Sequence, residues 1–265
     1  MQKRKHSIDV NLKEEIYKFE QELQIGEIIS RPNRFIMNVR IGEDVVKCHC
    51  PTTGKIGNIS LAGLPCLLSS STDKNRKTLH TVEAISVDNT VSWAGINQNA
   101  VNRYIEFFFK NELLEGIVAN GHKVLREQRI GDSKLDFKIE NTYIEVKMPL
   151  MYLPCATSNM NEISQRRIML FERFVRHINE LGSCLKNSGT AVMITCFMYD
   201  APMFQIPPMS ERNKVIADAV FQAVSSGVKM WQVNLGIDKE SVRLIKYFDI
   251  THIFESLLKR ASNPV

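Results

Sequence analysis

The chain has 265 residues, of which 44% are hydrophobic and 24% are charged, and its formal net charge is +5. This balance is typical of folded globular proteins and excludes a disordered polar chain. The sequence contains no apolar stretch long enough to span a membrane and no apolar signal core near its N-terminus. We therefore expect a cytoplasmic protein of one or two domains with no membrane partner, whose six cysteines are reduced thiols.

The first predicted element is an amphipathic helix over residues 11–24. Asn11 is a suitable N-cap, and Glu14 follows it at the spacing of a capping box. Gly26 marks the expected end of this helix. Its apolar residues recur at helical spacing, at Leu12, Ile16, Phe19 and Leu23.

Residues 25–95 are predicted to be all-β, because short alternating segments are separated by glycine, proline and asparagine. Strands are expected at 34–40, 45–50, 64–70 and 79–87. About five short strands in a region of this length favour a small barrel of the oligonucleotide-binding (OB) type. The pattern does not separate an OB barrel from an SH3-like one.

The same region carries the basic excess of the chain. Between Ile28 and Val82 there are eight Lys or Arg residues and three acidic ones, so the net charge of this stretch equals that of the whole chain. The excess suits a polyanion such as a nucleic acid, although a solvated basic surface gives the same pattern. Phe35 is either a base-stacking ring or a core residue of the barrel. The candidate phosphate contacts are Arg31, Arg34, Arg76 and Lys77.

A different pattern begins near residue 97, where helices and strands alternate. The predicted order is helix, three strands, helix, strand, helix, strand, which gives a mixed sheet flanked by helices. The helices are expected at 101–117, 161–186 and 211–226, and the strands at 124–130, 134–139, 143–148, 190–197 and 227–233.

Two of these strands carry the most informative residues. Asp136 lies in one, and Glu145 and Lys147 lie on the same side of the next. A two-residue turn at Glu140–Asn141 places Asp136 opposite Glu145, where two like charges are destabilising unless a cation lies between them. Hard oxygen donors of this kind suit Mg²⁺ or Mn²⁺. The alternative is an exposed polar strand face with a surface ion pair.

The acid, the hairpin turn and the Glu-x-Lys segment resemble the active-site core of the PD-(D/E)XK nuclease superfamily, which has the same order of helices and strands. The resemblance implies that Asp136 and Glu145 hold Mg²⁺ or Mn²⁺. It implies that Lys147 holds the attacking water or stabilises the pentacovalent oxygens. Glu106, on the preceding helix, would add a carboxylate to the metal site, and a solvated helix face explains this residue equally well.

Further stretches, taken in their order, resemble the sugar fermentation stimulation protein A family. They are residues 31–35, 49–54, 76–78 with 81–83, 95–97 with 102–103, 126–137, 143–147 and 226–228. The resemblance implies an N-terminal OB-like barrel joined to a PD-(D/E)XK nuclease-like domain, and the helix at 11–24 is an addition to the family pattern. We therefore expect the helix and barrel in residues 1–95 and the nuclease-like domain in residues 96–265. It also implies either a metal-dependent nuclease or a DNA-binding regulator.

The chain departs from the family pattern at two places. Lys134 stands where arginine is expected, which keeps a positive charge for phosphate but loses the planar fork of a guanidinium. In the tract Leu153–Pro154–Cys155 a cysteine replaces the acid of the family. Arg166 and Arg167, candidate phosphate contacts, appear only after a further polar stretch.

Two hypotheses about function follow from the sequence. The first is a metal-dependent nuclease, an enzyme that hydrolyses phosphodiester bonds of DNA or RNA. The second is a catalytically silent nucleic-acid-binding protein on a nuclease-like fold. The apolar sides of the N-terminal helix and of a C-terminal helix near Ile253 serve either a homodimer contact or packing within the chain.

Overall fold

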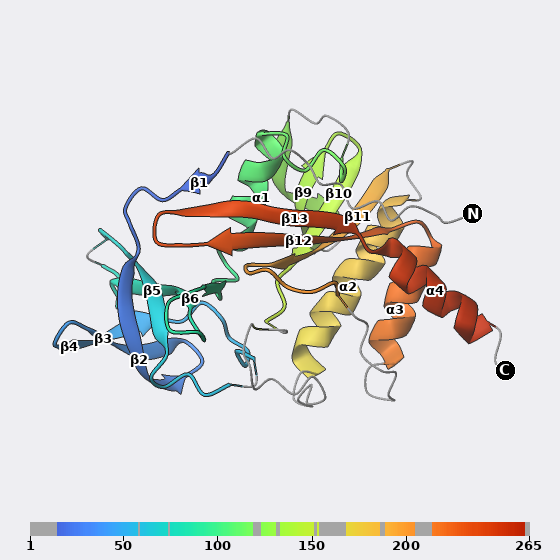
Figure 1. The fold of residues 1–265 in the computed structure, drawn as a ribbon. Helices are drawn as coiled ribbons and strands as arrows, with labels where there is room; N and C mark the ends of the chain where they lie inside the picture. Colours follow the sequence, from blue (N-terminus) through green and yellow to red (C-terminus); the bar gives the residue numbers. More distant parts are fainter. Residues whose placement is uncertain are drawn as a thin grey trace.

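A computed structural model describes residues 15–57, 59–73, 75–118, 123–130, 133–150, 153, 168–185, 189–204 and 214–262. These residues form a small barrel and a larger mixed sheet flanked by helices (Figure 1). The predicted fold class, an OB-like barrel followed by a helix-flanked mixed sheet, is therefore confirmed. Among the described helices, none has the length and apolar character needed to cross a membrane.

The barrel strands follow the alternation seen in the sequence. β2 pairs with both β3 and β5, and a parallel pairing between β4 and β6 closes the barrel. Inward-facing residues such as Met37 and Val39 are fully buried. The short strand β7 (Ala94–Gly95) extends the sheet beyond β6. The barrel strands are β2 (Gln24–Asn33), β3 (Ile36–Ile41), β4 (Asp44–His49), β5 (Pro65–Ser70) and β6 (His80–Ile85).

The second sheet has the strand order β1-β13-β12-β11-β10-β9-β8, in which β10, β11 and β12 run parallel to one another. The predicted order of helices and strands is confirmed, and β13 is an additional strand that the sequence did not indicate. The elements are α1 (Val101–Lys110), β8 (Val124–Ile130), β9 (Ser133–Ile139), β10 (Thr142–Lys147), α2 (Ile168–Cys184), β11 (Thr190–Phe197), α3 (Lys214–Ser225), β12 (Lys229–Ile237), β13 (Ser241–Asp249) and α4 (Thr251–Ser262).

The predicted helix over residues 11–24 is wrong for its described part, residues 15–24. Tyr17–Lys18 form strand β1, which pairs with β13, and Leu23 donates a backbone hydrogen bond to Lys239 at 2.7 Å. The Tyr17 ring packs edge-on against Tyr104 of α1, with ring centroids 5.0 Å apart. The apolar spacing is therefore satisfied by contacts with distant elements and not by a helix. Residues 11–14 lie outside the described residues.

Gly26 does not end a helix either. It lies within β2, where a Cβ atom would come within 2.6 Å of the Val39 side chain. The absence of a side chain at this position lets β2 and β3 approach closely inside the barrel.

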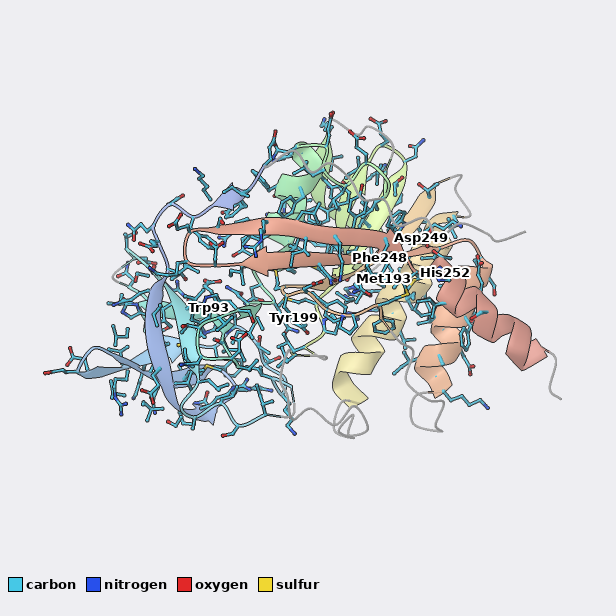
Figure 2. The ribbon with its side chains drawn as sticks, in the orientation of Figure 1. Trp93, Met193, Tyr199, Phe248, Asp249 and His252 are labelled. Atoms are coloured by element: carbon cyan, nitrogen blue, oxygen red, sulfur yellow. The ribbon has the colours of Figure 1, made fainter. Side chains whose placement is uncertain are left out.

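The barrel is fixed to the second sheet by close backbone contact. Gly95 of β7 donates a hydrogen bond to the Met198 carbonyl at 2.9 Å, and a Cβ atom on Gly95 would lie 2.5 Å from that of Met198. Trp93 and Tyr199 lie at this junction (Figure 2). One apolar core runs from the barrel through α1 to one face of the second sheet. A second core lies between the other face and helices α2, α3 and α4.

Candidate active site

The hairpin of β9 and β10 has the predicted register. Ile139 pairs with Thr142, Lys138 with Tyr143, and Phe137 with Ile144. The turn is at Glu140–Asn141, where Glu140 adopts a positive φ of 51°. The β9–β10 pairing ends at Phe137–Ile144, and Asp136 and Glu145 directly follow this last pair, where the predicted register places them opposite each other.

The alternative interpretation, an exposed polar strand face with a surface ion pair, is wrong for Glu145. β10 is an inner strand between β9 and β11, and helix α2 packs on the face that carries Glu145. Glu145 is only 1% exposed, although its alternation with the apolar Ile144 and Val146 is typical of a solvent-facing strand residue. A buried carboxylate is costly unless it is paired and hydrogen-bonded, so its contacts indicate what this position is for.

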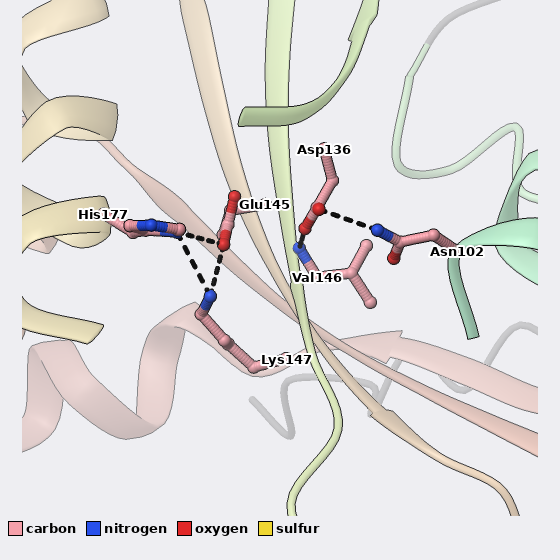
Figure 3. Close-up of polar contacts among 6 residues, drawn as sticks. All are labelled: Asn102, Asp136, Glu145, Val146, Lys147 and His177. Carbon is pink, nitrogen blue, oxygen red and sulfur yellow. Dashed lines mark hydrogen bonds and ion pairs between the residues drawn. The ribbon is translucent and has the colours of Figure 1, made fainter. Parts of the chain in front are cut away.

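The described polar contacts of the Glu145 carboxylate are all made by one of its two oxygens. Its Oε1 accepts hydrogen bonds from the Lys147 ammonium and from Nδ1 of His177 (Figure 3). Its Oε2 is buried and has no hydrogen-bond partner among the described residues. Burial by itself raises the pKa of Glu145, but the His177 hydrogen bond and the Lys147 charge outweigh burial and hold this pKa below its ordinary value. Glu145 is therefore a buried anion with one unpaired oxygen.

Asp136 is held by a different set of donors. Its Oδ1 accepts a hydrogen bond from Nδ2 of Asn102 at 2.7 Å, and its Oδ2 accepts one from the backbone N–H of Val146 at 2.7 Å. Burial raises the pKa of Asp136 to about 6, and the nearby Glu145 charge adds to that rise. Figure 3 shows Asp136 turned toward Asn102 and Glu145 turned toward His177 and Lys147.

The donor set fits a hard divalent cation. The two carboxylates lie on adjacent strands. In the part of the chain that the structure describes, three buried side-chain oxygens have no hydrogen-bond partner: Glu145 Oε2 and Asn102 Oδ1 at the site, and Glu180 Oε2 on α2. Unpaired buried oxygens cost free energy, and such atoms are the ligands that Mg²⁺ or Mn²⁺ prefers. Within the described ranges no group of three or more His, Cys, Asp or Glu side chains is placed to hold a metal ion. A cation site here would therefore consist of the Asp136 and Glu145 carboxylates together with neutral oxygen atoms.

Glu106 is not gathered with the two acids in the described structure. Its carboxylate lies 2.8 Å from Lys110 Nζ and 3.3 Å from Arg126 Nη1. Two cations thus balance its charge, and we leave Glu106 out of the ligand set. Lys134, a predicted phosphate contact, lies exposed on β9 and pairs with Glu127 at 3.1 Å.

The predicted phosphate contacts of the barrel have different environments. The Arg31 guanidinium donates to the carbonyls of Thr52 at 2.5 Å and Gly54 at 3.0 Å, so it fastens the loop after β4. Arg34, Arg76 and Lys77 are exposed. Arg76 also donates to Thr81 Oγ1 at 3.4 Å.

Phe35 is not a core residue of the barrel. It is 44% exposed at the turn between β2 and β3, and the Arg34 guanidinium stacks over its ring at 4.7 Å. The base-stacking alternative is the one that its exposure leaves open. Three positions named from the sequence, Cys155, Arg166 and Arg167, lie outside the described residues.

Sequence reasoning missed His177 and Asn102. His177 falls three residues after Phe174 and four before Leu181, on the apolar side of the predicted helix 161–186. A histidine on such a face was a usable signal. Asn102 precedes Glu106 by one helical turn, so the helix was correctly expected to face the site but through another residue.

Comparisons of this chain with a family model and with individual proteins point to the same family. Residues 29–96 match the model of the SfsA N-terminal OB domain. The sugar fermentation stimulation protein homolog of Microcystis aeruginosa is 28% identical over 77% of this chain and 85% of its own length. The homolog of Clostridium perfringens is 26% identical over 88% of this chain and 99% of its own length.

A solved structure has the same fold. The structure of Pyrococcus furiosus SfsA in complex with Ca²⁺ aligns with a TM-score of 0.67, 19% sequence identity, and coverage of 87% of this chain and 96% of that one. The resemblance to the sugar fermentation stimulation protein A family that the sequence motifs indicate is thereby confirmed.

Proposed function

We propose that this protein is a metal-dependent nuclease that hydrolyses phosphodiester bonds of DNA or RNA. The observation that carries the proposal is the buried Glu145 carboxylate beside Lys147 and Asp136, whose Oε2 has no hydrogen-bond partner in the described ranges of the chain. An arrangement that costs free energy in the unliganded protein is common where function requires it. The Pyrococcus furiosus structure is a complex with Ca²⁺, which supports a divalent cation in this fold.

Asp136 and Glu145 would hold the cation, with Asn102 Oδ1 as a neutral donor from α1. Bound there, Mg²⁺ or Mn²⁺ supplies a Lewis acid for the phosphate oxygens and lowers the pKa of water. Lys147 keeps about a quarter of its side chain exposed, at 28%, so its ammonium is able to reach a substrate from the Glu145 side. There it holds a water or donates to an oxygen on phosphorus as negative charge develops.

The barrel supplies the proposed nucleic-acid surface. In OB folds the second and third strands and the loops beside them bind oligonucleotides. The corresponding strands here are β3 and β4, and the adjacent turns carry the exposed Arg34–Phe35 pair and the exposed Arg76 and Lys77. We retain residues 1–95 and 96–265 as the proposed division between this binding domain and the nuclease-like domain.

The direct test is cleavage of single- and double-stranded DNA and RNA in Mg²⁺, Mn²⁺ or EDTA. We expect cleavage only with a divalent cation, and its loss in Lys147→Ala. Lys138→Ala is the matched control, because Lys138 lies on the same hairpin but stacks over the Tyr143 ring at 4.9 Å. Salt-sensitive binding without cleavage under every condition would support the silent binding protein instead, the alternative that the cysteine at position 155 favours.

The exposed ring on the barrel gives a separate prediction for binding. Phe35→Ala should weaken binding of single-stranded nucleic acid by about tenfold, since stacking on one ring contributes roughly 1–3 kcal/mol per base. The melting temperature of the Phe35→Ala variant should barely change, because the ring is 44% exposed and contributes little to the packed core. Fluorescence anisotropy with labelled oligonucleotides measures the effect. Val91→Ala, at an 85% exposed apolar side chain, is the control, and equal affinities for both variants would contradict a stacking role.

A further inference from the structure

His177 has an environment that packing alone does not explain. It lies on α2 and is only 4% exposed, yet its Nδ1 contacts two charged groups from the neighbouring strand β10. These are Glu145 Oε1 and Lys147 Nζ, the latter at 3.2 Å.

The chemistry of the three groups fixes the role of the ring nitrogen. A carboxylate only accepts hydrogen bonds and an ammonium only donates them, whereas a neutral imidazole nitrogen does one or the other. If Nδ1 carried no hydrogen, its lone pair would face a lone pair of Glu145 Oε1, and the two would repel each other. Nδ1 therefore carries the hydrogen and donates to Glu145, and Lys147 donates to the same oxygen.

Two donors on Oε1 fix the orientation of the carboxylate. They leave Oε2 as the oxygen of Glu145 for which the described residues offer no hydrogen-bond partner, and this atom is buried. If Lys147 alone held Oε1, the carboxylate would be free to turn whenever the ammonium moved to a substrate phosphate. Because His177 lies on α2, it keeps its hydrogen bond to Glu145 Oε1 when the Lys147 ammonium contacts a substrate phosphate.

The geometry assigns His177 as a positioning residue that holds Glu145 so that Oε2 is presented to a divalent cation. This inference rests on the proposed function and deepens it, since it names the group that orients the metal-binding carboxylate. Partners that hydrogen-bond a ligating side chain commonly contribute about 10- to 100-fold to metal affinity or activity.

Titration of the full-length protein with Mn²⁺ alone, followed by calorimetry, tests the assignment. His177→Leu keeps an apolar side chain in the site but removes the donor, and we expect Mn²⁺ affinity to fall by about tenfold or more. His177→Asn places an amide N–H close to the position of Nδ1 and should restore most of the affinity. Asn179→Ala, at an exposed position on the same helix, should match the wild type.

Crystals of metal-free His177→Leu and His177→Asn give a second readout that does not depend on cleavage. The Glu145 carboxylate should turn from its wild-type rotamer in His177→Leu and keep it in His177→Asn. Unchanged affinity and an unchanged rotamer in His177→Leu would overturn the positioning role and leave the nuclease proposal standing. A wild-type protein that takes up no Mn²⁺ would overturn both.

Discussion

Glu145→Gln should reduce metal-dependent cleavage by at least about 10³-fold while leaving the fold intact. A glutamine oxygen still accepts hydrogen bonds from His177 and Lys147, so the packing around Oε1 is preserved. In place of the unpaired Oε2, however, the amide presents N–H donors, which repel a cation. The loss of one ligand and its negative charge corresponds to about 4 kcal/mol of transition-state stabilisation.

Single-turnover cleavage in Mn²⁺ measures this loss, and thermal denaturation shows whether the variant is folded. Glu106→Gln is the matched control, because that carboxylate pairs with Lys110 and Arg126 and lies outside the proposed ligand set. We expect the control to cleave at nearly the wild-type rate. A Glu145→Gln variant that cleaves as fast as the wild type would remove Glu145 from the mechanism, and a large loss in Glu106→Gln would return that residue to the ligand set.

The hairpin that carries the site was predictable from the sequence because its determinants are local. Alternating apolar residues define both strands, and Glu140–Asn141 form a two-residue turn that fixes the register. The facing positions of Asp136 and Glu145 follow from that register alone. The burial of Glu145 does not, because it depends on α2 and on the parallel strand β11, which are distant in sequence.

The failures have the same physical origin. Ile16, Phe19 and Leu23 recur at a spacing that suits a helix, but Tyr17 packs on Tyr104 and β1 pairs with β13. Likewise, nothing near Asn102 in the sequence indicates that its amide reaches Asp136, thirty-four residues away. Long-range packing overrode local pattern in the first case and supplied a site residue in the second.

In metal-free buffer Asp136→Asn should be more stable than the wild type at pH 8, and the difference should vanish near pH 4. Burial raises the pKa of Asp136 to about 6, from an ordinary value of 3.8, so the folded protein binds this proton more tightly than the unfolded chain. The corresponding stability is fully present below about pH 3.8 and is lost as the pH rises through 6. A pKa difference of this size between the folded and unfolded protein corresponds to about 3 kcal/mol in the free energy of unfolding.

The asparagine recovers only part of that free energy. Its amide accepts from either Val146 N–H or Asn102 but not from both, and the lost hydrogen bond costs about 1 kcal/mol. We therefore expect a net gain of about 2 kcal/mol at pH 8, measured by urea denaturation in EDTA from pH 4 to 8. Glu145, whose pKa is lowered, has the opposite pH dependence, and comparing the two proteins at each pH removes its contribution.

Mn²⁺ should reverse the order of the two proteins. A cation at one hundred times its Kd stabilises the folded wild type by about 2.7 kcal/mol, because it binds the folded state alone. Asp136→Asn lacks the second carboxylate and should gain much less. The variant is then the more stable protein in EDTA and the less stable one in Mn²⁺. Equal gains in both proteins would place the cation away from Asp136. A stability difference between the two proteins that does not grow from pH 4 to 8 in EDTA would mean that this carboxyl group is not held in the buried environment described above.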